Sequence, residues 1–153
     1  MKTRKGFISN SSSTSFILAM GIVKDYDAFM KEIEENNVQI NGYNKLAFKK
    51  VRDLLENKGW WCEEPKPTED KLEMVNFMTS VSINIKDLKD DDLVAFLNFQ
   101  GNEGDGAFWT DDDMNYDIDD NYFEGNKAKT LILFRNSSNL CNVDVSIGAG
   151  RNG

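Results

Sequence analysis

The 153-residue sequence predicts a single α+β domain, in which an antiparallel β-sheet carries two amphipathic helices packed on one face. Three observations support this prediction. The length is that of one ordinary domain, which buries about 70% of the surface that its unfolded chain would expose. Apolar residues recur at helical spacing in the first third of the chain. Beyond Pro65 and Pro67 the apolar runs become short and alternate with Gly, Asn and Asp, as they do in antiparallel sheets.

The first element expected is a buried strand over Ser15–Val23, because this run is short, bulky and bounded by polar residues. One face of the strand is expected to enter the core, and it carries Phe16, Leu18 and Met20. Residues 1–14 form a Ser-rich N-terminal tag or tail, because Ser and Thr side chains compete for backbone hydrogen bonds and favour turns and caps. The single domain then covers residues 15–153.

Two amphipathic helices are expected next. The first covers residues 24–37, where Tyr26, Phe29, Met30 and Ile33 recur at helical spacing and two asparagines end the pattern. An Asn-Gly turn at residues 41–42 follows a short extended piece. The second helix covers residues 45–58 and ends at Gly59, a typical C-terminal glycine cap. Its apolar stripe consists of Leu46, Phe48, Val51, Leu54 and Leu55.

The second half of the chain is expected to supply most strands, after a loop over residues 62–70. The apolar runs there are 73–85, 93–100, 107–110, 130–135 and 140–147. We interpret 93–100 with 107–110 as one hairpin, joined by a glycine-rich turn, and the last two runs as a second hairpin. A helix over Asp90–Phe99 is an alternative to the first strand of this set, because Asp90 to Asp92 would cap it well.

Targeting signals and disulfides are not expected. The basic N-terminus is separated from the first apolar run by a polar Ser/Thr block, unlike a signal peptide. No run approaches the ~18 to 20 apolar residues that cross a bilayer. We therefore expect a cytoplasmic protein without membrane contact. Cys62 and Cys141 could pair in principle, but they lack metal-site spacing and are too few for a disulfide framework, so we interpret both as reduced and mostly buried.

Histidine is absent from the sequence. Its absence excludes Ser-His-Asp and Cys-His catalysis and histidine-ligated zinc. Enzymes that use carboxylate pairs or lysine exist, yet no catalytic or cofactor motif rises above background here. We expect a protein that is not an enzyme and holds no cofactor.

Acidic residues are concentrated in one part of the sequence. From Asp90 to Asn126 there is no Lys or Arg, and twelve of the 26 acids lie there; the remaining 14 acids face 18 basic residues, so the rest of the chain carries +4. One interpretation is a solvated loop that keeps the protein soluble. The other is a docking surface that steers a basic partner, while nucleic acid would be repelled. The residues expected to bind the partner are Asp105, Asp111, Asp112, Asp113, Asp117, Asp119, Asp120, Glu124 and Trp61.

Trp61 is included because neighbouring residues of an extended chain face opposite ways, so one ring of Trp60-Trp61 should be partly exposed and could anchor an interface. The alternative is that the exposed ring only covers the end of the preceding helix. The same acidic region also has the oxygen pattern of a calcium loop from Asp113 to Glu124. Ile118 takes the place of the glycine that such a loop needs, and the flanks do not favour helices. The weak metal candidates, for Ca²⁺ or Mg²⁺, are Asp113, Asn115, Asp117, Asp119 and Glu124.

The residues from Arg4 to Phe16 read RKGFISNSSSTSF. This stretch resembles an N-terminal tag of small proteins of tailed bacteriophages, in which a basic residue precedes Gly-Phe-Val/Ile, Ser-Asn and a serine run closed by Phe. The matching positions are Arg4, Gly6, Phe7, Ile8, Ser9, Asn10, Ser11, Ser12, Ser13, Ser15 and Phe16, and Thr14 interrupts the serine run. Because the tag precedes bodies of differing sequence, the resemblance implies phage origin and shared handling of the N-terminus, but not the activity of the body.

These observations lead to one hypothesis and two alternatives. The hypothesis is a phage-encoded, non-enzymatic accessory protein that binds and modulates a host protein, in host takeover or anti-defence, through its acidic surface. A structural protein of the virion is the first alternative, because a small acidic domain would also serve there. A divalent-cation-binding domain is the lesser alternative.

Overall fold

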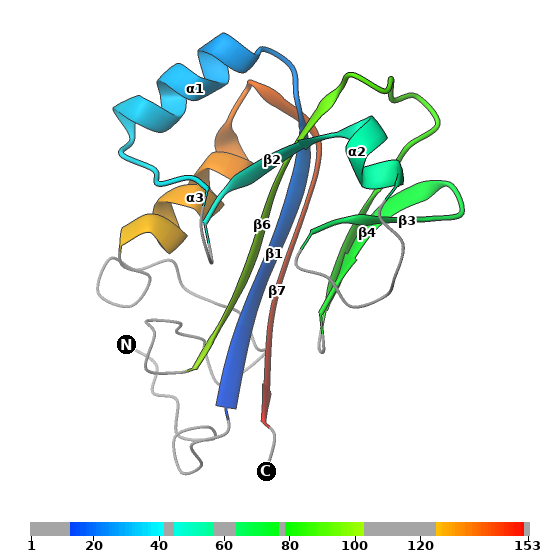
Figure 1. Cartoon of the computed structure of the whole chain (residues 1–153). Helices are drawn as coiled ribbons and strands as arrows, with labels where there is room; N and C mark the ends of the chain where they lie inside the picture. Colours follow the sequence, from blue (N-terminus) through cyan, green and yellow to red (C-terminus); the bar gives the residue numbers. More distant parts are fainter. Residues whose placement is uncertain (1–12, 42–44, 57–63, 77–78, 103–124, 152–153) are drawn as a thin grey trace.

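The computed structural model describes residues 13–41, 45–56, 64–76, 79–102 and 125–151. These residues form a mixed α+β structure of antiparallel sheets with a few helices, which confirms the predicted fold class (Figure 1). In chain order the elements are β1 (Ser13–Val23), α1 (Tyr26–Glu35), β2 (Ala47–Lys50), α2 (Val51–Leu55), β3 (Lys66–Thr68), β4 (Lys71–Val75), β5 (Ser80–Asn84), β6 (Leu93–Asn102), α3 (Gly125–Asn136) and β7 (Leu140–Arg151).

The larger sheet has four strands in the order β2-β6-β1-β7, and all neighbours are antiparallel. Strand β1 therefore lies in the middle, where Ile17 pairs with Phe99 of β6 on one side and with Ile147 of β7 on the other. The smaller sheet has the order β3-β4-β5 and is also antiparallel. The strand expected from residue 15 thus begins two residues earlier, at Ser13.

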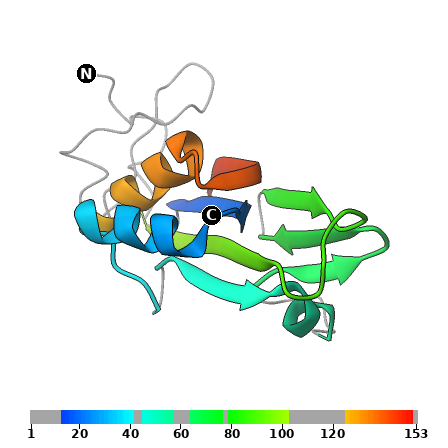
Figure 2. The same ribbon diagram turned by 90° about the horizontal axis from the view of Figure 1, so that it is seen from above.

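The alternation of side chains along β1 divides the molecule into three layers, which Figure 2 shows from above. Ile17 and Ala19 face one core, which α1 and α3 cover. Leu18, Met20 and Ile22 face a second core, which is covered by the smaller sheet and α2. Both faces of β1 are apolar because both are buried, and the expected burial of Phe16, Leu18 and Met20 is confirmed.

Helix α1 confirms the first predicted helix. Asp25 caps its start, since the Asp25 Oδ1 atom accepts a hydrogen bond of 3.0 Å from the backbone N–H of Ala28. Phe29 and Ile33 are buried against the larger sheet. Beyond the last turn, Asn37 adopts a positive φ of 56°, a backbone conformation that Asn tolerates better than most residues and that ends the helix.

The second predicted helix, over residues 45–58, is wrong for its first half. Residues 47–50 form strand β2, which pairs with β6 in the register Ala47 to Phe96. Only Val51–Leu55 is helical, and its Val51 and Leu54 enter the core of the smaller sheet rather than the core beneath α1. Sheet pairing overrides helical propensity here, because β6 offers an edge to this segment.

The helix that accompanies α1 is α3, so the prediction of a strand over residues 130–135, and with it the second hairpin, is wrong. The run Thr130–Phe134 is apolar throughout, and such a run does not distinguish a strand from a buried helix. Leu131, Leu133 and Phe134 are buried, whereas Ile132 is 43% exposed. Two helices do cover one face of the larger sheet, but the second comes from a different part of the chain than expected.

The other strand predictions fare better. The run 73–85 contains most of β4 and all of β5, which pair with each other, and Asn76 N donates to Thr79 O just beyond the paired residues. The run 93–100 is a strand, β6, and the alternative helix is wrong. The predicted loop 62–70 contains a short strand, β3, in which Pro67 pairs with Leu72 at the edge of the smaller sheet. The expected strand at 107–110 lies outside the described residues.

Candidate functional site

The residues predicted to bind a partner or a metal lie outside the described residues. Trp61 falls in the range 57–63, and the acids from Asp105 to Glu124, with Asn115, fall in the range 103–124. The structure does describe the two residues that flank the acidic segment, which we define as residues 103–124. Asn102 ends β6 and Gly125 begins α3.

Three of the twelve clustered acids are described, and two of them fix the turn before β6. The Asp92 carboxylate accepts a hydrogen bond of 2.8 Å from the backbone N–H of Lys89. The Asp92 and Asp90 carbonyls accept from the N–H groups of Val51, at 2.9 Å, and Arg52, at 3.1 Å. These bonds satisfy two N–H groups at the start of α2, which α2 itself leaves without a partner. Asp90 and Asp92 therefore have a structural role.

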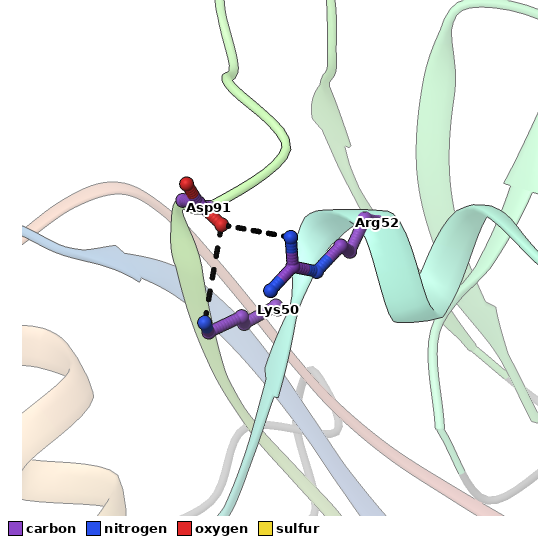
Figure 3. Close-up of polar contacts among 3 residues, drawn as sticks. All are labelled: Lys50, Arg52 and Asp91. Carbon is purple, nitrogen blue, oxygen red and sulfur yellow. Dashed lines mark ion pairs between the residues drawn. The ribbon is translucent and has the colours of Figure 1, made fainter.

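The third described acid, Asp91, forms ion pairs with two basic residues (Figure 3). Its Oδ1 atom lies 3.2 Å from Arg52 Nη1 and 3.9 Å from Lys50 Nζ. The Asp91 side chain is 76% exposed, so this cluster contributes at most about 1 kcal/mol to stability. Its main effect is on local charge, because Lys50 and Arg52 together offset the negative charge of Asp91.

These basic residues lie at the opposite end of β6 from Asn102, the last described residue before the acidic segment. The cluster is at the start of β6, whereas the acidic segment follows the end of β6 at Asn102. A strand of ten residues spans roughly 30 Å, which is nearly four Debye lengths of about 8 Å at physiological ionic strength.

The end of the larger sheet at Asn102 also contains Ser13 and Thr14, the last two residues of the Ser-rich stretch 1–14. Thr14 pairs with Asn102 of β6 and with Gly150 of β7, and Ser13 pairs with Arg151. Ser13 and Thr14 therefore belong to the central strand, and Thr14 lies directly beside the residue that precedes Glu103. Figure 1 shows β1, β6 and β7 ending together at this edge.

Two further polar clusters connect layers of the fold. Glu32 Oε1 of α1 accepts from Ser137 Oγ at 2.6 Å and from Asn139 Nδ2 at 3.1 Å, which holds α1 against the turn between α3 and β7. On the opposite face, Asp144 of β7 accepts from the backbone N–H of Ser82 at 2.9 Å. The hydroxyl groups of Thr79 and Ser146 are also hydrogen-bonded, so β5 is attached to β7 through side chains. The sequence pattern did not predict these hydrogen bonds, because the residues that form them are 62 to 107 positions apart in the chain.

Metal and thiol chemistry find little support in the described part of the chain. Within residues 13–41, 45–56, 64–76, 79–102 and 125–151, no three His, Cys, Asp or Glu side chains gather closely enough to hold a metal ion. Cys141 is a free, half-buried thiol that packs against the core of the smaller sheet, and Cys62 lies outside the described residues. No helix among the described residues is long and apolar enough to span a membrane.

Comparison of the chain with protein-family models, with curated proteins and with solved structures gave no match. The function therefore has to be argued from the charge distribution and from the described residues, Asn102 and Gly125, between which the acidic segment is inserted. Both features make the acidic segment, rather than the described polar clusters, the strongest candidate for a binding site.

Proposed function

We propose that this chain is a non-enzymatic accessory protein of a tailed bacteriophage, which binds and modulates a host protein through its acidic segment. The N-terminal stretch that resembles the phage tag supports the origin. The uncompensated charge of the acidic segment, nine acids and no basic residue from Glu103 to Glu124, carries the binding part of the proposal. Such a segment attracts a basic surface and accelerates its association at low salt.

The described acids strengthen this argument by contrast. The Asp92 carboxylate accepts a hydrogen bond from the backbone N–H of Lys89, and the Asp91 carboxylate is paired with Lys50 and Arg52. These two carboxylates thus have partners within the described fold. The acidic segment has no basic residue within its own sequence to serve this purpose, so a basic partner is the simplest source of compensating charge.

The test is a capture experiment from bacterial lysate at low and at raised salt. The test variant replaces six acids of the segment with Asn, at Asp111, Asp112, Asp113, Asp117, Asp119 and Asp120. The matched control neutralises six exposed, described acids elsewhere, at Asp27, Glu34, Glu35, Asp53, Glu56 and Asp87. We expect one salt-sensitive host protein to bind the unmodified chain and the control, but not the test variant.

Two results would count against the proposal. Equal loss of the partner in both variants would show that only net charge matters. Recovery of the chain as a stoichiometric component of purified phage particles, measured by mass spectrometry, would favour the structural protein of the virion instead.

A further inference from the structure

Strand β6 is longer than its partner at the edge of the sheet. It has ten residues, but β2 pairs only with the first four, from Leu93 to Phe96. Among the described elements no strand continues beside Leu97–Asn102 on the side away from β1. Figure 1 shows β6 extending well beyond the end of β2. This second half of β6 is therefore an edge within the described fold.

The hydrogen-bonding direction of each β6 residue follows from one bond. Val51 N donates to Asp92 O at 2.9 Å, in line with the register of β2 and β6. Opposed residues of antiparallel strands alternate between pairs that exchange hydrogen bonds and pairs that do not. Even-numbered residues of β6 therefore direct their backbone groups toward β2, and odd-numbered residues direct theirs toward β1. By this alternation, Asn98, Gln100 and Asn102 direct theirs outward at the point where β2 has ended.

These outward groups form a regular row of donors and acceptors. Each of the three residues offers one N–H and one C=O, spaced by two residues, which is the spacing that an added strand requires. Such an edge is a template for an extended segment of another protein. We define it as the open edge of β6.

The sequence that follows the open edge indicates which segment fits there. Directly after Asn102 the chain continues into the acidic segment. Because Glu103 is bonded directly to Asn102, the charge at this end of β6 favours a basic added strand over an acidic one. Resting on the proposed function, we propose that the open edge of β6 accepts an extended, basic segment of the partner as an additional strand. The backbone bonds supply affinity, and the acidic sequence that begins directly after Asn102 is the reason for expecting a basic segment there.

A peptide pair tests this proposal on the full chain. The probe is an eight-residue peptide of alternating Lys and Val. The control peptide has the same sequence with N-methyl groups on two adjacent central residues, which block both edges of the peptide without changing its charge. We expect the unmodified peptide to bind at least about tenfold more tightly. We also expect it to slow hydrogen exchange at the amides of Gln100 and Asn102.

Variants of the protein give a second, independent readout. Gln100→Pro removes an outward N–H but none of the bonds to β1, which come from odd-numbered residues, and Gln100→Ala keeps the N–H. We expect Gln100→Pro to lose the preference for the unmodified peptide and Gln100→Ala to retain it. Thermal unfolding verifies that both variants fold, and the exchange measurement on the unmodified chain stands even if Gln100→Pro does not.

The outcomes separate this inference from the proposed function. Equal binding of the two peptides by the unmodified chain would overturn strand addition and leave the acidic segment as an electrostatic site. Binding of neither peptide would count against both. Slow exchange at Gln100 in the free chain would show that another part of the chain already covers the edge, and would also overturn the inference.

Discussion

Gly21 occupies a position in β1 that has little room for a side chain. The pairing of β1 with β7 shifts between Met20, opposite Asp144, and Ile22, opposite Cys141, so two residues of β7 face Gly21. One of them, Asn142, adopts a positive φ of 52°, which Asn tolerates. A Cβ atom at Gly21 would lie 3.0 Å from Val143 Cγ2. The bulge brings Val143 so close to residue 21 that only glycine fits there without a shift of its neighbour.

Gly21→Val should destabilise the protein by about 1–3 kcal/mol, because the added methyl groups crowd Val143. The measurement is denaturant unfolding of Gly21→Val, of Val143→Ala and of the double variant. We expect Val143→Ala to recover part of the loss, since it removes the atom nearest to the new side chain. Strictly additive losses would show that the contact between residues 21 and 143 is not the cause.

Leu18→Asp should unfold the domain. The side chain is fully buried between β1 and the smaller sheet, and an unpaired buried charge costs several kcal/mol against a total stability of ~5–15 kcal/mol. The matched control is Ile132→Asp, because Ile132 is 43% exposed. Circular dichroism and thermal unfolding should show a folded control and an unfolded Leu18→Asp. A folded Leu18→Asp variant would mean that this core is not required.

At the scale of elements, the two edges of the larger sheet are protected by different means. β2 has only four residues and carries Lys49 and Lys50. β7 has twelve residues, but its bulge and the inward-facing Asp144 interrupt a regular edge. Short length, lysine, bulges and inward charges all discourage unwanted pairing. Residues 97–102 of β6, beyond the end of β2, contain no lysine or other charged residue, and their pairing with β1 has no bulge. This part of the edge therefore lacks the protection that β2 and β7 have.

The cap of α1 should contribute measurably to stability. Asp25→Ala removes the acceptor for the N–H of Ala28 and should cost about 0.5–2 kcal/mol. Asp27→Ala is the control, because Asp27 lies exposed in the first turn and is not the capping residue. Urea unfolding of both variants measures the difference. Equal losses would assign the effect to the general attraction between acids and the helix start rather than to the hydrogen bond.

The sequence predicts some elements of this fold better than others, for physical reasons. β1 and α1 were predictable because their apolar residues follow a clear local pattern and polar residues bound them. Residues 45–58 were not, because the same stripe suits a helix or a strand until β6 is present as a partner. Thr130–Phe134 is apolar throughout and has no period to measure. The local sequence pattern determines the secondary structure of a segment only where pairing with a distant segment does not favour another structure.

The candidate site was likewise predictable from the sequence only in part. The clustering of acids is visible in the sequence, but the structural use of Asp90 to Asp92 is not. It depends on Lys50, Val51 and Arg52, which belong to a distant and earlier part of the chain. The open edge of β6 likewise depends on where β2 ends. The sequence shows where charged residues cluster. Only the pairing of strands shows which of the described charges have partners and which strand edges have no neighbouring strand.

At the scale of the whole molecule, neutralising the acidic segment should not destabilise the fold. Nine acids without a base repel one another, most strongly at low ionic strength, where the Debye length exceeds ~10 Å. The variant with six Asp→Asn substitutions should therefore melt at an unchanged or higher temperature. The control is the same measurement with millimolar Ca²⁺, for which we expect little shift in either protein. A large calcium-dependent stabilisation of the unmodified chain, lost in the variant, would reveal a cation site from Asp113 to Glu124.

The central position of β1 has a consequence for how the protein is made. β1 precedes both of its partners in the chain, since Ile17 meets Phe99 of β6 and Ile147 of β7, which a ribosome adds far later. At typical rates of synthesis the second partner follows β1 after on the order of ten seconds. Until β6 is made, a strand that is apolar on both faces has no strand to pair with, and until β7 is made one of its edges stays unpaired. Folding of the larger sheet therefore has to wait for late synthesis, and conditions that slow translation should increase aggregation of the nascent chain.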